Sequence, residues 1–181
     1  VIEPNTFGTH EFIELCRLLD TEPYICHNGL AEVQEMSDWV EYSNSNEGKF
    51  AEMRRENGYP SPLNVKIWSV GNERSGRDYI HKVRDAGLAM KKMDSSLLVT
   101  CSGIHGNSRI DPYLFEAAGE YLDYISAHQY WIENWQILET PDYLSCIMLS
   151  EKPEAYIQDV IHQIQTAEKE GQIKEGKIKI A

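Results

Sequence analysis

The sequence predicts an α/β fold, a partial (β/α)8 TIM barrel, and three observations support this prediction. Short apolar, β-prone runs alternate with amphipathic helical segments at least four times along the chain, which is typical of a parallel sheet with helical crossovers. Several of these runs end in polar residues beside a glycine, as strands do at the ligand-binding edge of such sheets. Five strands are recognisable, whereas a closed barrel needs eight and typically about 250 residues. Residues 1–181 are therefore expected to form the central portion of a barrel domain.

The N-terminal part of the chain should form a helix, a buried strand and a second helix. Thr9 is the predicted N-cap of the first helix, and Pro23 ends it. The helical spacing of apolar residues assigns its buried face to Phe12, Leu15, Cys16 and Leu19. Residues 24–26 form the predicted strand, which ends at Asn28 and Gly29. The inward side chains of the second helix, about residues 31–43, should be Val33, Met36, Trp39 and Val40.

A long connection, residues 44–64, separates this helix from the next strand and is rich in Asn, Ser, Gly and Pro. A short helix is predicted near residues 51–56. This connection leads from a helix into a strand, so in a barrel it lies on the face opposite the active site. Its charged cluster is interpreted as a solvated ion-pair face formed by Glu52, Arg54, Arg55 and Glu56.

The remaining elements continue the alternation. An amphipathic helix is predicted from the spacing of Tyr79, Val83, Ala86 and Met90. The following segments are a strand at 97–101 with an exit loop at 102–106, a helix at 112–121, a strand at 124–128, a long loop at 129–152, a helix ending at Gly171, and a strand beginning at Lys177.

The strand over residues 65–70 is the centre of the functional prediction. Ile67, Trp68 and Val70 suit an enclosed strand, and Gly71 allows the backbone to turn. Asn72 and Glu73 then stand at the strand's C-terminal end, which is where catalytic groups lie in parallel α/β proteins.

Composition excludes several classes of function. A formal net charge of −12 argues against nucleic acid, because phosphate binding needs clustered Lys and Arg. No apolar run approaches 18 residues, so no membrane span is expected. The four cysteines are far apart, which predicts buried free thiols rather than a metal or redox site. Free thiols favour a cytoplasmic location, although secretion stays open because the N-terminus of the sequence could be truncated. No metal and no organic cofactor is expected.

A glycosidase needs two carboxylates beside the scissile bond, and Glu73 is the candidate for the protonated one. An apolar wall or a neighbouring carboxylate would raise the pKa of such an acid. The amide of Asn72 could hydrogen-bond a sugar hydroxyl next to the reacting carbon. The alternative is a strand-end glutamate in a surface salt bridge with Arg74.

A second polar strand end carries His128, Tyr130 and Trp131. His128 and Tyr130 are two residues apart, so in an extended chain they point to the same side. Trp131 and Trp135 could stack on sugar rings, but tryptophans also anchor long loops. His128 could equally be a hydrogen-bonded core histidine, and Asn28 before Gly29 is first of all a turn signal.

A serine triad is rejected. Ser102, His27 and His105 could suggest one, but the Gly-x-Ser-x-Gly nucleophile elbow is absent.

In their order along the chain, these elements resemble the α-L-arabinofuranosidases of glycoside hydrolase family 51, which are retaining enzymes of the large (β/α)8 glycosidase clan. The resemblance runs through most of the chain. It is carried by the motifs PNTFGTHEF (4–12), EPYICHN (22–28), WVEY (39–42), RENG (55–58), NVKIW (64–68), GNE (71–73) and HQY (128–130). The GNE motif alone is shared across the clan, whereas the whole ordered set is much more specific.

The resemblance implies a role for each matching residue. Glu73, on the fourth barrel strand, would be the general acid/base, and Asn72 would bind the sugar 2-hydroxyl. Asn28, on the third strand, would line the glycone pocket. His128 and Tyr130, after the sixth strand, would contact substrate and nucleophile. The chain would then hold roughly strands 3 to 7, and its substrate would be an arabinose-containing oligo- or polysaccharide.

Two departures from the family pattern accompany the resemblance. The Gly/Thr-rich loop after Asn28 is shortened to Gly29-Leu30. The strand at 178–181 would lead directly into the Asp-Glu-Trp element that carries the nucleophile, so that glutamate is expected beyond residue 181. The N-terminal strands, the eighth strand and the C-terminal β-sandwich are likewise expected outside this chain.

We therefore expect the 181 residues alone to be inactive and the intact protein to be an active homo-oligomer. Another clan member (a xylanase, β-glucosidase or endoglucanase) and a non-catalytic carbohydrate-binding remnant are the alternatives.

Overall fold

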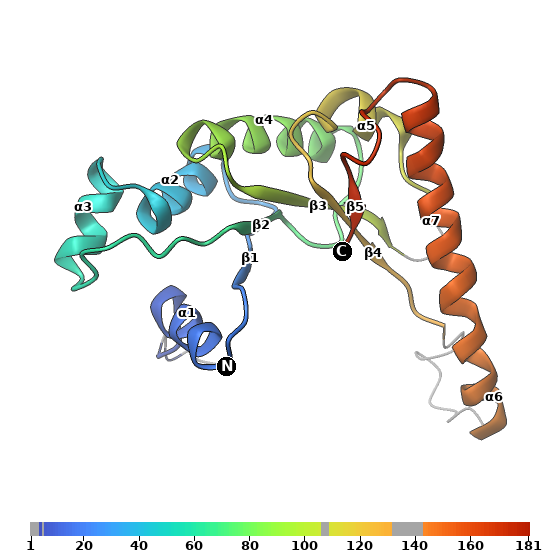
Figure 1. Ribbon diagram of the computed structural model, residues 1–181, viewed down its shortest axis with the longest axis horizontal. Helices are drawn as coiled ribbons and strands as arrows, with labels where there is room; N and C mark the ends of the chain where they lie inside the picture. Colours follow the sequence, from blue (N-terminus) through green and yellow to red (C-terminus); the bar gives the residue numbers. More distant parts are fainter. Residues whose placement is uncertain (1–3, 5, 106–108, 132–142) are drawn as a thin grey trace.

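The computed structural model describes residues 4, 6–105, 109–131 and 143–181 and contains a five-stranded parallel sheet (Figure 1). The strands are β1 (Tyr24–Cys26), β2 (Ile67–Val70), β3 (Leu98–His105), β4 (Tyr124–His128) and β5 (Lys179–Ile180). Their spatial order, β1-β2-β3-β4-β5, follows the chain, and every neighbouring pair is parallel. A doubly wound sheet reverses its strand order at a switch point, so this sequential order fits a barrel. The predicted parallel α/β architecture is confirmed.

Helices connect the strands. They are α1 (Thr9–Leu18), α2 (Val33–Asn44), α3 (Lys49–Glu56), α4 (Arg77–Met93), α5 (Pro112–Ala118), α6 (Tyr143–Met148), η1 (Leu149–Glu151) and α7 (Lys152–Lys169). In Figure 1, α4 and α5 lie along one side of the sheet beside the long α7, whereas α1 lies apart from them, below β1. Residues 143–151 were predicted as loop, and this is wrong because they form α6 and η1. These elements are too short for helical periodicity to reveal them.

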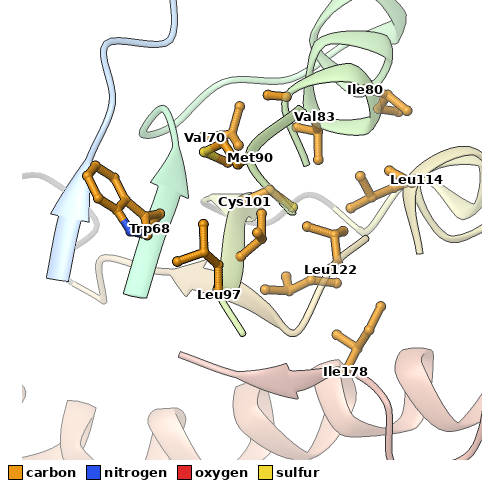
Figure 2. Packing of buried hydrophobic residues seen from close by; sticks show 14 of the residues in the cluster. Trp68, Val70, Ile80, Val83, Met90, Leu97, Cys101, Leu114, Leu122 and Ile178 are labelled. Atoms are coloured by element: carbon orange, nitrogen blue, oxygen red, sulfur yellow. The ribbon is translucent and has the colours of Figure 1, made fainter. Parts of the chain in front are cut away.

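The main core lies between the sheet and its helices. Trp68 and Val70 of β2 are fully buried, and Figure 2 shows them with Val83 and Met90 of α4. Their β3 register partners are Val99 and Cys101, respectively, which share this face and are also fully buried. The predicted inward face of α4, which consists of Tyr79, Val83, Ala86 and Met90, is confirmed.

The other face of the sheet carries small polar residues near its C-terminal edge. Cys26, Ser69 and Thr100 are in register across β1, β2 and β3. Ser102 of β3 pairs with Ser126 of β4 one step further along. Because residues in register share a face, these side chains line the surface that would face the interior of a closed barrel.

Strand β3 is longer than predicted. The sequence suggested an exit loop from Ser102, but the strand continues to His105 through an irregularity between Ser102 and Ile104. Gly103 permits this path, since a Cβ there would lie only 1.8 Å from Cγ2 of Ile125. The extension brings His105 level with His128 of β4.

Helix α1 is capped and buried differently from the prediction. Gly8, not Thr9, is the N-cap, and the Gly8 N–H donates to the Glu11 carboxylate at 2.8 Å. Ile13 and Cys16 are the buried positions of this helix, whereas Leu15 and Leu19 are 41% and 66% exposed. Of the predicted buried face only Cys16 is buried and Phe12 is partly buried, whereas the prediction missed Ile13.

The interpretation of Arg54 as part of a solvated face is wrong. Arg54 is fully buried, and its guanidinium donates to the backbone carbonyls of Tyr42, Ser45 and Tyr59 at 2.8, 2.8 and 3.1 Å. These bonds join α3 to the C-terminal end of α2. The neighbouring Glu52 and Arg55 side chains do lie in solvent, 4.0 Å apart.

At the N-terminal edge of the sheet, Asp123 holds two lysines. Its carboxylate contacts Lys91 Nζ at 2.6 Å and Lys177 Nζ at 2.7 Å, and it accepts the Val99 N–H at 2.9 Å. Burial alone would raise the pKa of Asp123, but these three hydrogen bonds outweigh it and lower the pKa below its ordinary value. The cluster fixes β5 beside β4.

Within the described part of the chain, no helix is long and apolar enough to cross a membrane. Cys16 and Cys101 are buried free thiols, as predicted, whereas Cys26 is free and exposed. The side chain of Cys146 lies outside the described residues.

Candidate active site

The C-terminal ends of β1, β2 and β4 lie at one edge of the sheet and carry most of the predicted site residues. Asn28 follows β1, Asn72 and Glu73 follow β2, and His128 ends β4. The turns that follow β1 and β2 are tightly packed against each other, because a Cβ on Gly71 would lie 2.9 Å from the Gly29 Cα. Gly71 also has a φ of +74°, a conformation that glycine adopts without steric cost.

Glu73 and His128 are brought together across 55 residues of sequence. Glu73 Oε1 lies 3.1 Å from His128 Nδ1, and the two side chains are 40% and 31% exposed. The alternative salt bridge between Glu73 and Arg74 does not form. Glu73 has a φ of +49°, a left-handed conformation that costs a non-glycine residue about 1 kcal/mol or more. Backbone strain of this kind is common where a side chain must be aimed for function.

Asn28 and Asn72 lie at the same edge, but neither hydrogen-bonds Glu73. Asn28 Oδ1 accepts the Leu30 N–H at 2.9 Å, so Asn28 makes the turn that its position before Gly29 indicated. Lys82 of α4 donates to the carbonyls of Gly29 and Ala31 at 3.2 and 2.9 Å, fixing this loop. No sequence pattern indicated that contact, which joins residues more than 50 positions apart. Asn72 is exposed.

The segment after β4 is held by α7. Tyr156 donates a hydrogen bond to the His128 carbonyl at 3.1 Å, and its ring packs edge-on against Trp131, with centroids 6.1 Å apart. Trp131 is therefore packed against α7. Tyr130 is 71% exposed. Trp135 and Gly106 lie outside the described residues.

Tyr79 connects the strand that carries Glu73 to its neighbour. Its hydroxyl donates to the Val70 carbonyl at the end of β2 and accepts the Ser102 N–H of β3 at 2.9 Å. Burial raises the pKa of Tyr79, so the hydroxyl stays protonated. In the sequence Tyr79 is only an apolar position of a helix, and its polar role was missed.

His27 belongs to an aromatic cluster rather than to a serine triad. Its ring stacks on Trp68 with centroids 5.0 Å apart and meets Trp39 edge-on at 5.2 Å. His27 is 4% exposed, and its Nε2 has no hydrogen-bond partner among the described residues. Burial lowers the pKa of His27 to about 4, so the ring is neutral at pH 7. No hydrogen bond joins it to Ser102, and the His105 side chain lies outside the described residues.

Cavity size does not locate the site. A cavity of about 460 Å³ is lined by Ile13, Thr21, Pro23, Leu63 and Lys66, before the N-terminal ends of β1 and β2. A smaller one, of about 170 Å³, adjoins the C-terminal end of β2 and includes Arg74 and, within β3, Ser102. Among the described residues, no group of three or more His, Cys, Asp or Glu side chains could hold a metal ion.

Residues 1–146 match the family model described as the alpha-L-arabinofuranosidase 1 domain. The chain belongs to this alpha-L-arabinofuranosidase family. The resemblance seen in the sequence is thereby confirmed.

Curated relatives and solved structures agree. The chain is 39% identical over 122 residues to "Probable alpha-L-arabinofuranosidase C" of Aspergillus terreus, which covers 61% of this chain and 24% of that protein. It is 33% identical over 147 residues to the "Intracellular exo-alpha-L-arabinofuranosidase" of Bacteroides ovatus, covering 74% and 28%. The solved alpha-L-arabinofuranosidase of Thermotoga maritima, an arabinose complex, superimposes with a TM-score of 0.72 at 31% identity, covering 99% of this chain and 37% of that one.

The chain thus spans about a quarter of the length of these curated relatives and somewhat over a third of the solved structure. The Bifidobacterium longum family 51 enzyme has a TM-score of 0.84 at 24% identity, which supports the fold alone. These likenesses confirm the partial barrel fold.

Proposed function

We propose that the protein to which this chain contributes is a retaining glycoside hydrolase that removes α-L-arabinofuranosyl residues from hemicellulose-type arabinosides. The observation that carries the proposal is the contact between Glu73 and His128 at the sheet edge, in a chain of the arabinofuranosidase family. In this proposal residues 1–181 supply the central portion of the catalytic barrel. A cytoplasmic location is proposed from the free thiols and the relative named as intracellular.

Glu73 acts as the general acid/base. In the first step its carboxyl proton passes to the glycosidic oxygen while a second carboxylate attacks the anomeric carbon, so the leaving group departs as an alcohol. In the second step Glu73 removes a proton from water, which attacks the glycosyl ester and regenerates the second carboxylate.

The contact with His128 suits both protonation states of Glu73. A neutral imidazole protonated at Nδ1 donates to the carboxylate, and it can equally donate to the carbonyl oxygen of the carboxylic acid at the same 3.1 Å separation, which leaves the acid's single proton for the glycosidic oxygen. His128 is itself held by Tyr156 through its backbone carbonyl. This arrangement orients the Glu73 side chain in both steps.

The second carboxylate is proposed to follow β5. The Ala181 N–H donates to the Ile125 carbonyl at 2.9 Å, and the Ala127 N–H donates to the Ala181 carbonyl at 3.4 Å. A residue after Ala181 would therefore lie level with the end of β4, next to the His128 that contacts Glu73. Retaining glycosidases place their carboxyl groups about 5–5.5 Å apart, and neighbouring strand exits allow such a separation.

Substrate contacts are proposed for the exposed side chains at the same edge. Asn72 would bind the 2-hydroxyl, Asn28 would line the glycone pocket, and Tyr130 would orient the nucleophile. Trp131, already packed against Tyr156, would stack on a sugar ring. These roles come from the family resemblance, and the shared sheet edge supports them.

Substrate profiling tests the assignment. The protein should hydrolyse an aryl α-L-arabinofuranoside at least 100-fold faster than the matching xyloside or glucoside. NMR of the first product should show the anomeric configuration of the substrate. Preference for the xyloside or glucoside would assign another clan activity. Inversion would exclude double displacement.

A further inference from the structure

We propose that the cavity beside the β2 exit binds the carboxylate of a uronic acid residue carried by the leaving-group side of the substrate. This rim cavity has a volume of about 170 Å³, and its polar lining includes Arg74, Gly76, Ser102, Arg109 and Asp111. Identifying the anion as part of the substrate rests on the proposed function. The capacity to bind a small oxyanion rests on the cavity alone.

Two guanidinium groups border the rim cavity. Arg74, directly after Glu73, forms no hydrogen bond or ion pair with any described residue. Arg109 is 69% exposed and lies 3.9 Å from Asp159, a weak pairing in solvent. Guanidinium groups match the planar geometry of carboxylates and bind them through two parallel hydrogen bonds. Both side chains are thus available to an anionic ligand.

The N-terminus of α4 adds further donors. Gly76, the N-cap of this 17-residue helix, has a φ of +93° and supplies no side-chain acceptor. The first N–H groups of a helix carry partial positive charge and favour anions.

The one carboxylate in the polar lining is already engaged. Asp111 accepts the Tyr113 N–H at 3.0 Å as the N-cap of α5 and lies 3.8 Å from Arg77. Asp78, in the first turn of α4, does not line the cavity. The cavity therefore offers net positive charge on a chain whose formal net charge is −12.

The position of the rim cavity points to the leaving-group side. A general acid protonates the leaving oxygen, so the group beyond the scissile bond lies next to it, and Arg74 adjoins Glu73 in the chain. The volume is below the range of about 300–1,000 Å³ for drug-sized ligands, which suits one charged substituent rather than an oligosaccharide. A carboxylate on the first sugar of the leaving group meets both conditions, because it lies next to the scissile bond and is small enough for the cavity.

Ligand titration tests this inference, with binding followed by NMR or calorimetry on the protein that contains this chain. The probes are D-galacturonate, neutral D-galactose as its matched control, and inorganic phosphate. Galacturonate should bind at least tenfold more tightly than galactose at low salt, and 0.5 M NaCl should weaken it. Arg74→Gln and Arg109→Gln should each weaken galacturonate about tenfold, whereas Arg17→Gln, an exposed arginine of α1, should not.

Equal affinity for galacturonate and galactose, or unchanged affinity in both Gln variants, would overturn the inference. Binding of phosphate without galacturonate would overturn the assignment to an acidic sugar. Glu73→Gln separates this inference from the proposed function, because it should abolish hydrolysis and leave galacturonate binding intact. A protein that binds galacturonate but hydrolyses no arabinoside would refute only the function.

Discussion

The 3.1 Å separation between Glu73 Oε1 and His128 Nδ1 joins the exits of two strands that are not neighbours in the sheet. Strand β3 lies between them, so both side chains must reach across its C-terminal end. The contact therefore reports the curvature of the sheet as well as the orientation of the candidate acid. It makes His128 a positioning residue for Glu73.

Replacing His128 should weaken acid catalysis without removing it. His128→Ala leaves Glu73 in place but free to rotate, so kcat/KM should fall about 10–100-fold. The loss should be larger for poor leaving groups, which depend most on proton donation. Steady-state kinetics on aryl arabinofuranosides of graded leaving-group ability measure this effect. A uniform loss across the series would instead indicate a role for His128 in sugar binding.

The left-handed backbone at Glu73 predicts an inverted order of stability. Glu73→Gly and Glu73→Ala both remove the contact with His128, but only glycine adopts a φ of +49° freely. The Gly variant should therefore have the higher free energy of unfolding, by about 1 kcal/mol. Urea unfolding measures the difference. The same pair at Glu14, inside α1, is the control and should favour Ala by about 1 kcal/mol. Equal stability at position 73 would show that its backbone is unstrained.

Tyr79 should matter for stability through its hydroxyl alone. Tyr79→Phe leaves the Val70 carbonyl and the Ser102 N–H without their shared partner, which should lower the free energy of unfolding by about 1–3 kcal/mol. Tyr121→Phe, whose hydroxyl makes no hydrogen bond with the described residues, should change it by less than about 0.5 kcal/mol. Urea unfolding compares the two. Equal effects would refute the bridging role.

Burial of His27 predicts a loss of stability in acid. Its pKa is about 4 in the folded protein and about 6.5 when unfolded, so the unfolded state binds the proton first as the pH falls. The free energy of unfolding should decline from about pH 6.5 and lose about 3 kcal/mol by pH 4. His27→Phe should flatten this region, whereas His162→Gln on the exposed face of α7 should not. An unchanged slope in His27→Phe would contradict this assignment.

The sequence predicted the ends of β1, β2 and β4 well, but it missed the extension of β3 and the buried polar contacts. Glu73 and His128 could be placed because apolar β-prone runs mark where each strand stops. Tyr79 fitted the apolar face of a helix. Helical spacing cannot tell a tyrosine that only packs from one whose hydroxyl also bridges two strands. Arg54 sits among charged residues, so local composition suggested solvent, whereas its guanidinium is buried and donates to three backbone carbonyls of the segments that flank α3. Sequence periodicity cannot predict these contacts, because they depend on how the elements pack in three dimensions.

The most direct test of the account measures Glu73→Ala on two arabinofuranosides, one with an alkyl or sugar leaving group and one with a dinitrophenyl group that needs no proton. If Glu73 is the acid/base, turnover of the first substrate should fall about 10²–10⁴-fold. The second substrate should still form a glycosyl-enzyme, which the variant hydrolyses slowly. Added azide should react with this intermediate in place of water and release an arabinosyl azide. Equal rates for variant and parent on the alkyl arabinoside would contradict the central claim.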